Sequence, residues 1–230
     1  MPRAFASWSG GKDCCLALHR AVASGLDVRY LANTVSDDGQ RSRSHGISAA
    51  VIRKQSEALD IPIVQQRTEG DNYEAQFIRM IKAFRQEGID GGVFGDIDFN
   101  PHREWIERVC AEAGITPHLP LWGEDQKKLM EEFIDAGFIA VVIAVKAELF
   151  GEEVLGQKID RNFIHHLDEL SKTRDITPCG EAGEYHTLVI DGPLFKKRLE
   201  ITESRKVERE GIRFLDILNI KLKSITRSAV

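Results

Sequence analysis

The pattern of apolar and polar positions changes its period repeatedly over the first two thirds of the chain. Short apolar runs, such as residues 138–145, are typical of strands that are buried on both faces. Between these runs, apolar residues recur every three or four positions, as on one face of a helix. The alternation predicts βαβ units, and therefore an α/β fold with a parallel, twisted sheet and helices on both faces, a Rossmann-like arrangement. We expect strands at residues 4–8, 28–35, 62–66, 92–95 and 138–145, and helices at 12–24, 47–59, 71–88, 100–114 and 125–136.

Residues that favour helix ends support these boundaries. Asp71 followed by Glu74 matches a capping box, and Asn100 followed by Pro101 is a favourable helix start. Glycines follow several of the predicted helices, where they suit the left-handed conformation of a C-terminal cap. The polar residues 36–45 are expected to form a loop.

The alternation ends near residues 146–150. Beyond this point, residues 160–171 have a helical pattern, and residues 199–207 and 212–222 predict an antiparallel pair that turns at Gly211. We therefore expect two domains, an N-terminal α/β domain at 1–147 and a smaller C-terminal α+β domain at 148–230.

Composition narrows the class of protein. The chain has 230 residues, of which 42% are hydrophobic and 29% charged, as is usual for a globular protein. The formal net charge of -5 argues against a large non-specific contact with nucleic acid. The longest apolar run is too short to span a bilayer, and the N-terminus lacks the apolar segment of a signal peptide. The 4 cysteines form no Cys-x-x-Cys pair, which indicates reduced thiols in a reducing compartment. Together these features predict a cytoplasmic protein without a membrane partner.

The most specific chemical signal is the loop Ser9-Gly10-Gly11-Lys12-Asp13, which follows the first predicted strand and opens the first predicted helix. Ligands of open α/β sheets bind where the strands end. Two glycines let the backbone approach an anion, and the amides and dipole of the helix attract negative charge. The spacing is neither a Walker A loop nor G-x-G-x-x-G. A glycine turn without a ligand is the alternative, but the added Lys12 and Ser9 donors favour a phosphate site.

This loop resembles the pyrophosphate loop of the N-type ATP pyrophosphatase superfamily. The resemblance implies an adenine nucleotide alpha hydrolase-like fold that binds ATP with Mg²⁺. It also implies that the five loop residues hold the nucleotide, with Lys12 and Asp13 catalytic. The superfamily usually has Ser at the next position, where this chain has Cys14, a weaker donor. Because the backbone amide is retained, we expect Cys14 to remain at the nucleotide with an altered side-chain contact.

Three further segments resemble one branch of that superfamily, the diphthine–ammonia ligase family. The first is Ser44-His45-Gly46-Ile47. The second is Gly95-Asp96-Ile97 with Arg103, Trp105 and Cys110, which leads to Pro120-Leu121-Trp122. The third is Pro178-Cys179-Gly180-Glu181-Ala182-Gly183-Glu184-Tyr185-His186-Thr187. Each segment alone is a weak signal, but their order over most of the chain is specific.

The resemblance implies a ligase reaction. ATP would transfer AMP to a carboxylate and release pyrophosphate, and ammonia would then displace AMP and form an amide. In the family's namesake reaction, the carboxylate belongs to diphthine, a modified histidine on translation elongation factor 2. The implied partners are ATP, ammonia or ammonium, and this carboxylate acceptor. The sequence leaves open whether the chain forms a homodimer.

Two segments are expected to complete the nucleotide site. His45 and Gly95 are expected to contact the nucleotide, although a surface position at a helix start is an equal alternative for His45. Asp96 follows a short predicted strand and is expected to be catalytic and to hold Mg²⁺. The alternative for Asp96 is a cap of the turn into the next helix.

The acceptor side is expected to include an acidic, glycine-rich loop. Glu181 and Glu184 are expected to be catalytic, since a carboxylate near ammonium can take its proton; a solvated turn is the alternative. Arg103 is expected to neutralise the charge of the acceptor or phosphate, with a solvated helix cation nearly as consistent. The expected acceptor-binding residues are Arg103, Cys179, Gly180, Glu181, Glu184 and His186.

His186 departs from the family's pattern, because diphthine-forming members typically have Glu there. The His-bearing pattern resembles a prokaryotic subgroup linked to cobalamin metabolism, so a cobalamin-related or other small acceptor stays open. Two further hypotheses are a tRNA-modifying relative and a nucleotide-binding protein without ligase activity. The acidic net charge argues against the first, and the acidic loop argues against the second.

Overall fold

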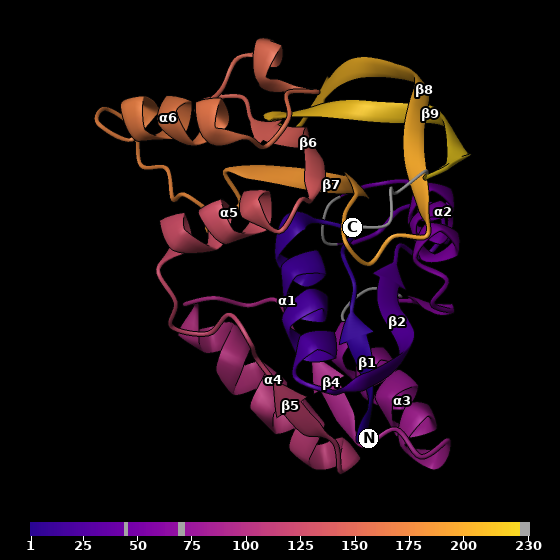
Figure 1. Cartoon of the computed structure of the whole chain (residues 1–230). Helices are drawn as coiled ribbons and strands as arrows, with labels where there is room; N and C mark the ends of the chain where they lie inside the picture. Colours follow the sequence, from indigo (N-terminus) through magenta and orange to yellow (C-terminus); the bar gives the residue numbers. More distant parts are fainter. Residues whose placement is uncertain (44–45, 69–71, 226–230) are drawn as a thin grey trace.

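The computed structural model describes residues 1–43, 46–68 and 72–225 and contains two sheets (Figure 1). The first sheet is parallel, and its strands are β1 (Arg3–Ser7), β2 (Asp27–Val35), β3 (Ile63–Arg67), β4 (Gly91–Val93) and β5 (Thr116–His118). The strand order is β3-β2-β1-β4-β5, so β1 is central. The helices of this half are α1 (Lys12–Ala23), α2 (Ala49–Leu59), α3 (Tyr73–Gln86) and α4 (Asn100–Ala113).

Helices cover both faces of the parallel sheet, which confirms the expected α/β fold. Phe5 of β1 packs with Phe77 and Phe84 of α3, in a core that α4 also joins. Its neighbours Ala4 and Ala6 lie in the other core, with α1 and α2. Successive residues of a strand face opposite sides, so β1 is apolar throughout its buried length because both of its faces are covered.

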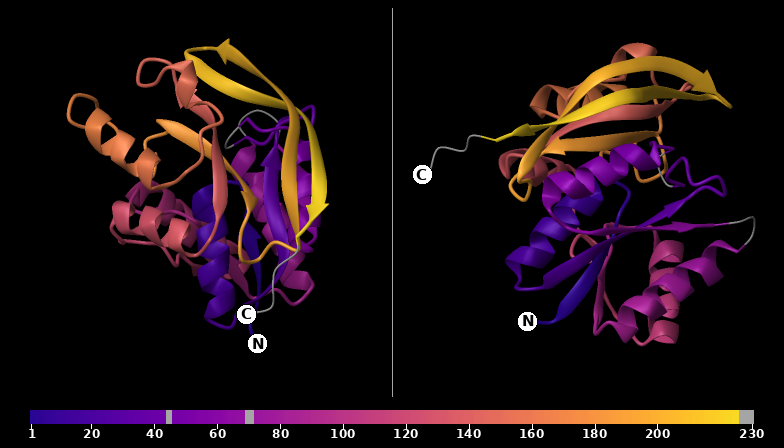
Figure 2. Two further views of the ribbon diagram at one scale, coloured as in Figure 1. Left: turned by 45° about the horizontal axis from the view of Figure 1, so that its top comes forward. Right: turned by 90° about the vertical axis from the view of Figure 1, so that its right-hand side faces the viewer.

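The second sheet is antiparallel, in the order β7-β6-β9-β8. Figures 1 and 2 show it as a layer beyond α1 and α2, so that these two helices lie between the sheets. None of the helices in the described ranges is long and apolar enough to cross a membrane. The elements of this half are α5 (Gln126–Asp135), β6 (Ile139–Lys146), η1 (Glu152–Val154), α6 (Arg161–Leu170), β7 (Tyr185–Asp191), β8 (Lys197–Arg209) and β9 (Ile212–Ser224).

The apolar run at 138–145 forms a strand, but in the second sheet and not in the parallel one. It is β6, which pairs with β7 on one side and β9 on the other. An antiparallel strand that is covered on both faces is as continuously apolar as a buried parallel strand, so apolarity does not distinguish the two. The chain passes from the first sheet to the second between β5 and β6, which is before the boundary expected near residues 146–150.

Three local features also differ from the sequence patterns. The sequence does not indicate β5, which contains Pro117, or β7, which follows the glycine-rich segment. α3 begins after Asn72, and the expected cap Asp71 lies outside the described residues. The carboxylate of Glu74 accepts hydrogen bonds from Trp105 and Arg108 of α4.

The expected antiparallel pair is confirmed as the β8–β9 hairpin. Its turn residues Glu210 (φ 51°) and Gly211 (φ 75°) both have positive φ, as a type I′ turn requires. The hairpin lies over α2 (Figure 2). Asp216 of β9 is buried and accepts hydrogen bonds from Arg41 (3.1 Å) and Arg205 (3.1 and 3.2 Å). These contacts fasten the loop after β2 to the hairpin.

Replacing Asp216 by asparagine is expected to lower the free energy of unfolding by about 2 kcal/mol at pH 7, since hydrogen bonds between charged groups are lost. Burial would raise the pKa of Asp216, but Arg41 and Arg205 hold it below its ordinary value. The contribution is therefore present above about pH 4 and is lost as the pH falls through the lower folded-state pKa. Denaturant unfolding at pH 7 and pH 3 measures the difference. Asp135→Asn, at an exposed ion pair with Arg161, is the matched control and should change little; equal effects would contradict the prediction.

Candidate active site

The loop Ser9-Gly10-Gly11-Lys12-Asp13, or phosphate-type loop, has the expected strand–loop–helix form. β1 ends at Ser7, and α1 begins at Lys12 with Gly11 at the N-cap position. Gly10 has φ +84°, and a Cβ atom there would lie 2.6 Å from Ile52 Cδ1. Only glycine avoids both the left-handed strain and this clash. The loop thus directs the N-terminus of α1 toward the edge of the sheet at which β1 ends.

Lys12 lies in the wall between the two halves of the molecule. Its side chain is 4% exposed, and Nζ lies 2.9 Å from Asp13 Oδ2. Nζ also donates to the Cys179 carbonyl oxygen and lies 5.1 Å from the centroid of the Tyr185 ring. Burial alone would lower the pKa of Lys12, but Asp13 and these neighbours raise it above its ordinary value, so the ammonium stays charged.

Cys14 closes the loop in the way that a serine could. Its thiol donates to the Gly11 carbonyl oxygen (3.2 Å) and accepts from the Ser9 hydroxyl (3.4 Å). Burial would raise the pKa of this thiol, but hydrogen bonds from Cys15 and Ser9 lower it below its ordinary value. Cys14 therefore makes, within the loop, two hydrogen bonds of the kind that a serine hydroxyl could make.

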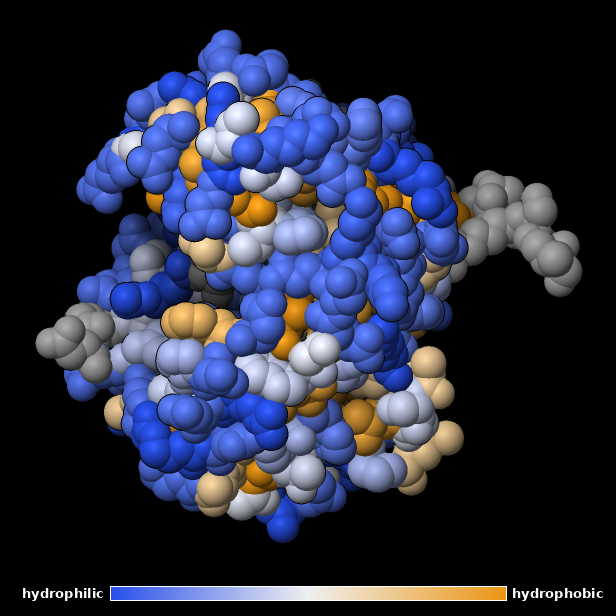
Figure 3. Space-filling model, turned by 90° about the vertical axis from the view of Figure 1, so that its left-hand side faces the viewer, coloured by the Kyte–Doolittle hydropathy of each residue, from blue (hydrophilic) through white to orange (hydrophobic). Residues whose placement is uncertain are grey.

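The loop opens into a cavity of about 570 Å³ between the two halves. A hollow between two parts of a mostly hydrophilic surface is visible in Figure 3. The cavity is bounded by the carboxyl ends of β1, β2 and β4, by the first turns of α1, α3 and α4, and by the segment before and within β7. Expected site residues that line it are Ser9, Lys12, Asp13, Cys14, Gly95, Asp96, Cys179, Gly180, Glu181 and His186.

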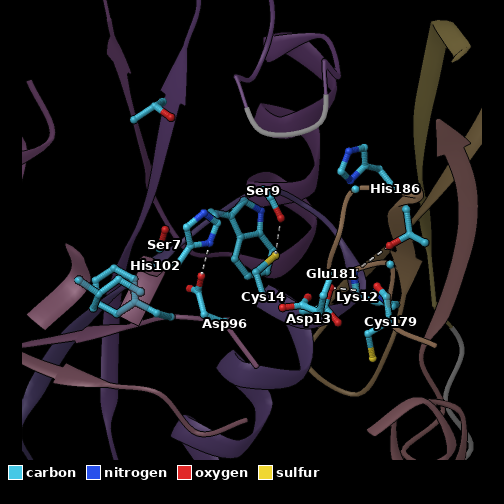
Figure 4. Close-up of a pocket in the computed structure, with 18 of the residues that line it drawn as sticks. Ser7, Ser9, Lys12, Asp13, Cys14, Asp96, His102, Cys179, Glu181 and His186 are labelled. Atoms are coloured by element: carbon cyan, nitrogen blue, oxygen red, sulfur yellow. Dashed lines mark hydrogen bonds and ion pairs between the residues drawn. The ribbon is translucent and has the colours of Figure 1, made fainter. Parts of the chain in front are cut away.

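Carboxylates gather on one side of the cavity. Figure 4 shows Asp96 facing His102, with Asp13 between this pair and Glu181 in that view. Burial, and next the charge of Asp13, raise the pKa of Glu181 to about 7. His102 Nδ1 lies 3.1 Å from Asp96 Oδ1, and this hydrogen bond raises the pKa of His102 above its ordinary value. A carboxyl group that is partly protonated at pH 7 is suited to exchange protons with a ligand.

These carboxylates could hold a magnesium ion only together with oxygen atoms from a bound ligand. Among the residues that the structure describes, no group of three or more His, Cys, Asp or Glu side chains could hold a metal ion. Mg²⁺ prefers one or two carboxylates, several waters and substrate phosphates to an all-protein cage. Asp96 and Asp13 face the same cavity and could supply such carboxylates to a nucleotide-bound Mg²⁺.

Aromatic side chains form another part of the cavity lining. Tyr73, Phe77 and Trp105 lie with ring centroids 5.1 to 6.3 Å apart. Trp105 Nε1 donates to Glu74 (2.9 Å), which a bidentate pair with Arg108 fixes in turn. Arg108 lowers the pKa of Glu74 to about 2. The indole therefore has a set orientation and offers a ring face for a flat or cationic ligand group.

Four expected site residues of the described structure do not line the cavity: Gly10, Gly11, Arg103 and Glu184. Glu184 is 1% exposed; its Oε1 accepts from the Thr177 amide (2.6 Å), while its Oε2 has no partner among the described residues. Arg103 pairs with Glu107 (2.7 Å) and lies over the Trp122 ring. His45 lies outside the described residues. In the acidic loop, Glu181 therefore lines the cavity, whereas Glu184 is buried and holds the loop through the Thr177 amide.

Sequence reasoning also missed residues that line the cavity. His102 lies in the first turn of α4, six positions after Asp96, and a histidine so near a strand-end carboxylate is a signal that could have been read. Tyr73 gives no such signal, because only the fold brings the start of α3 to this wall. Thr187 was noted within its segment without a role, although its hydroxyl accepts from the Lys12 amide (3.0 Å).

Glu181→Gln is expected to stabilise the fold at high pH. The raised pKa means that the folded state binds a proton more tightly than the unfolded state, so wild-type stability falls as the pH rises from about 4.5 to 7. Gln resembles the protonated form and escapes this loss. The melting temperature of the variant relative to wild type should thus rise over that range and then level off. A difference that does not vary with pH would contradict the raised pKa.

A parallel sheet with a glycine loop at its central strand, opening into an acidic and aromatic cavity, defines the chain as an α/β protein with a ligand-sized cavity at the carboxyl edge of its sheet. A family model described as the diphthamide synthase N-terminal domain matches residues 2–117, and one described as the diphthamide synthase C-terminal domain matches residues 125–222. The chain belongs to the diphthamide synthase family. The change of sheet after β5 lies between the two matches.

The curated relatives, from distantly related organisms, all have one name. The chain is 30% identical to "Diphthine--ammonia ligase" of Rattus norvegicus, over 97% of this chain and 91% of the relative. It is 30% identical to the Danio rerio protein of that name, over 86% of each. It is 32% identical to the Schizosaccharomyces pombe protein, over 88% of this chain, and spans only about a third (36%) of that longer protein.

Proposed function

We propose that this chain is an ATP-dependent carbon–nitrogen ligase that adenylates a carboxylate and amidates it with ammonia, as the names of its relatives suggest. One observation carries the proposal. The phosphate-type loop and the segment with Cys179, Glu181 and His186 line the same cavity, and the Lys12 ammonium joins them through the Cys179 carbonyl. A nucleotide and an acceptor can thus meet there without a large rearrangement.

In the first step, a carboxylate oxygen attacks the α-phosphorus of ATP, and pyrophosphate leaves with the electron pair of the broken P–O bond. The α1 amides and the Lys12 ammonium stabilise the phosphate charge as it moves to pyrophosphate. A nucleotide-bound Mg²⁺, held by Asp96 with Asp13, would supply further positive charge. The hydrogen bond between Asp96 and His102 raises the pKa of His102 and so favours the charged imidazole form at the same wall.

In the second step, ammonia attacks the acyl carbon, and AMP leaves. Ammonium must first lose a proton, and Glu181 is placed to accept it because its pKa of about 7 lies close to neutral pH. The three carboxylates Asp13, Asp96 and Glu181 also make the cavity attractive to a cation. Glu184 holds the Thr177 amide and thereby the loop on which Glu181 lies.

The acceptor is proposed to be diphthine on elongation factor 2, as the relatives' name indicates for them. His186 is the main reason to keep a cobalamin-related or other small carboxylate as an alternative. Burial, and next Lys12, lower the pKa of His186 to about 4, so a neutral imidazole stands where diphthine-forming members typically have a carboxylate. A nucleotide-binding protein without ligase activity is the further alternative. A cytoplasmic location and a homodimer likewise stay predictions.

The deciding experiment incubates the purified protein with ATP, Mg²⁺, ammonium and diphthine-bearing elongation factor 2. The proposal expects equal amounts of AMP and pyrophosphate and a conversion of acid to amide in the mass of the factor. AMP formation with a pool of small carboxylates, but not with the factor, would favour the other acceptor. Absence of AMP under every condition would leave a nucleotide-binding protein without catalysis.

Glu181→Gln and Glu184→Gln form a matched pair for the acceptor step. Glu181→Gln is expected to lower amide formation about 10²-fold while ATP binding persists, because the proton acceptor is lost. Glu184→Gln keeps an oxygen for the Thr177 amide and should have a much smaller effect. Single-turnover amide formation and ATP affinity are the measurements. A larger loss in Glu184→Gln than in Glu181→Gln would contradict the assignment.

A further inference from the structure

Strand β7 of the second sheet holds the phosphate-type loop at several points. The Val189 amide donates to the Gly10 carbonyl oxygen (3.0 Å), and Gln55 Nε2 donates to the carbonyl oxygens of Gly10 (2.9 Å) and Val189 (2.8 Å). The Lys12 amide donates to Thr187 Oγ1 (3.0 Å). The last contact differs in kind, because it engages an N-terminal amide of α1, a group that also attracts phosphate.

The Thr187 side chain is 2% exposed and lines the cavity. A hydroxyl group has two acceptor lone pairs and one proton to donate. One lone pair of Thr187 is taken by the Lys12 amide, and that bond sets the hydroxyl against the first turn of α1. The hydroxyl proton can then donate to an oxygen that is bound at the same turn.

We propose that Thr187 is a phosphate-binding residue that the second sheet contributes to the nucleotide site. This inference rests on the proposed function. The Thr187 hydroxyl accepts the Lys12 amide and donates to a phosphate oxygen of the nucleotide. It supplies a hydroxyl donor at a turn where Cys14 has a thiol that is directed to the Gly11 carbonyl.

The position of Thr187 also links the two substrates. β7 carries His186 one residue earlier, and Glu181 precedes the strand on the same loop. A phosphate that is bound by both α1 and Thr187 therefore holds β7, with the proposed acceptor-binding residues, next to the phosphate-type loop. Loss of the hydroxyl should weaken phosphate binding first and leave the affinity for the acceptor nearly unchanged.

The test compares Thr187→Val, which keeps the shape without the hydroxyl, with Thr187→Ser, which keeps the hydroxyl. Affinities for inorganic pyrophosphate and for ATP are measured by calorimetry on the full chain with Mg²⁺. Thr187→Val is expected to bind both about tenfold more weakly, as loss of one hydrogen bond to a charged group implies, and Thr187→Ser to remain within about threefold of wild type. The KM for ATP should rise while the KM for the acceptor does not.

Thr173→Val is the control, because Thr173 is exposed and its hydroxyl donates to the Leu170 carbonyl oxygen at the end of the preceding helix. Thr187→Ala removes the hydroxyl with a smaller side chain and replaces Thr187→Val if that variant does not fold. Wild-type affinity in folded Thr187→Val, or in folded Thr187→Ala where it is used instead, would overturn the proposal. A loss of affinity in Thr187→Ser as large as that in Thr187→Val would also overturn it. If wild type binds neither pyrophosphate nor ATP, the nucleotide site of the proposed function is itself rejected.

Discussion

Lys12→Met is expected to lower pyrophosphate release from ATP about 10³-fold, the largest effect of a single side chain in this protein. A positioned cation at developing phosphate charge contributes about 10²–10³ in rate, and this ammonium is shielded from water. Its loss also releases the Cys179 carbonyl and so loosens the acceptor segment from the phosphate-type loop. Pyrophosphate release with saturating ATP and acceptor is the measurement, with circular dichroism to show that the fold persists.

The matched control for this variant is Lys82→Met. Lys82 is exposed on α3 and pairs with Glu112, so its replacement should change turnover by less than about twofold. Lys12→Met should also melt at a lower temperature, because the half-buried carboxylate of Asp13 loses its partner. Normal pyrophosphate release in a folded Lys12→Met variant would show that the loop is not the phosphate site. A low rate with unchanged pyrophosphate affinity would place Lys12 in the chemical step and not in binding.

How far the site can be predicted from sequence depends on how its residues are spread along the chain. Residues Ser9 to Asp13 are contiguous, and their chemistry follows from a local turn, so the phosphate-type loop was predicted with its helix. Tyr73 and Thr187 reach the cavity only because α3 and β7 are brought to the ends of other strands. Glu184 shows the opposite difficulty, because a glutamate in a glycine-rich segment looks exposed until the packing around it is known.

The fold was predictable to the same degree. The parallel sheet follows from the repeated exchange of strand and helix patterns, and the β8–β9 hairpin follows from two long strand patterns around Gly211. β6 was predicted as a strand but not in its sheet, since its partners β7 and β9 lie about 40 and 70 residues further along the chain. Sequence patterns report burial, and burial on two faces is common to both kinds of sheet.

Gly95→Ala is expected to lower turnover more than about 10²-fold and to lower the free energy of unfolding by about 2–3 kcal/mol. A Cβ atom at Gly95 would lie 2.9 Å from the backbone C of Asp13 and 2.9 Å from the backbone N of Cys14. Neither atom can move without displacing the first turn of α1, and such overpacking costs about 1–3 kcal/mol. A shift of about 1 Å in a group that positions substrate can cost about 10²-fold in rate.

Gly137→Ala separates this clash from the general cost of replacing glycine. Gly137 has φ +84° with nothing within 4 Å of a Cβ atom, so alanine there brings backbone strain without a steric contact. It should lower stability by about 1 kcal/mol and leave turnover unchanged. Gly95→Ala differs because the backbone it would strike also carries the amides of the phosphate-type loop. Wild-type turnover in Gly95→Ala would mean that the site tolerates a displacement of α1. The close approach of Gly95 to the N-terminus of α1 would then not be needed to position the site.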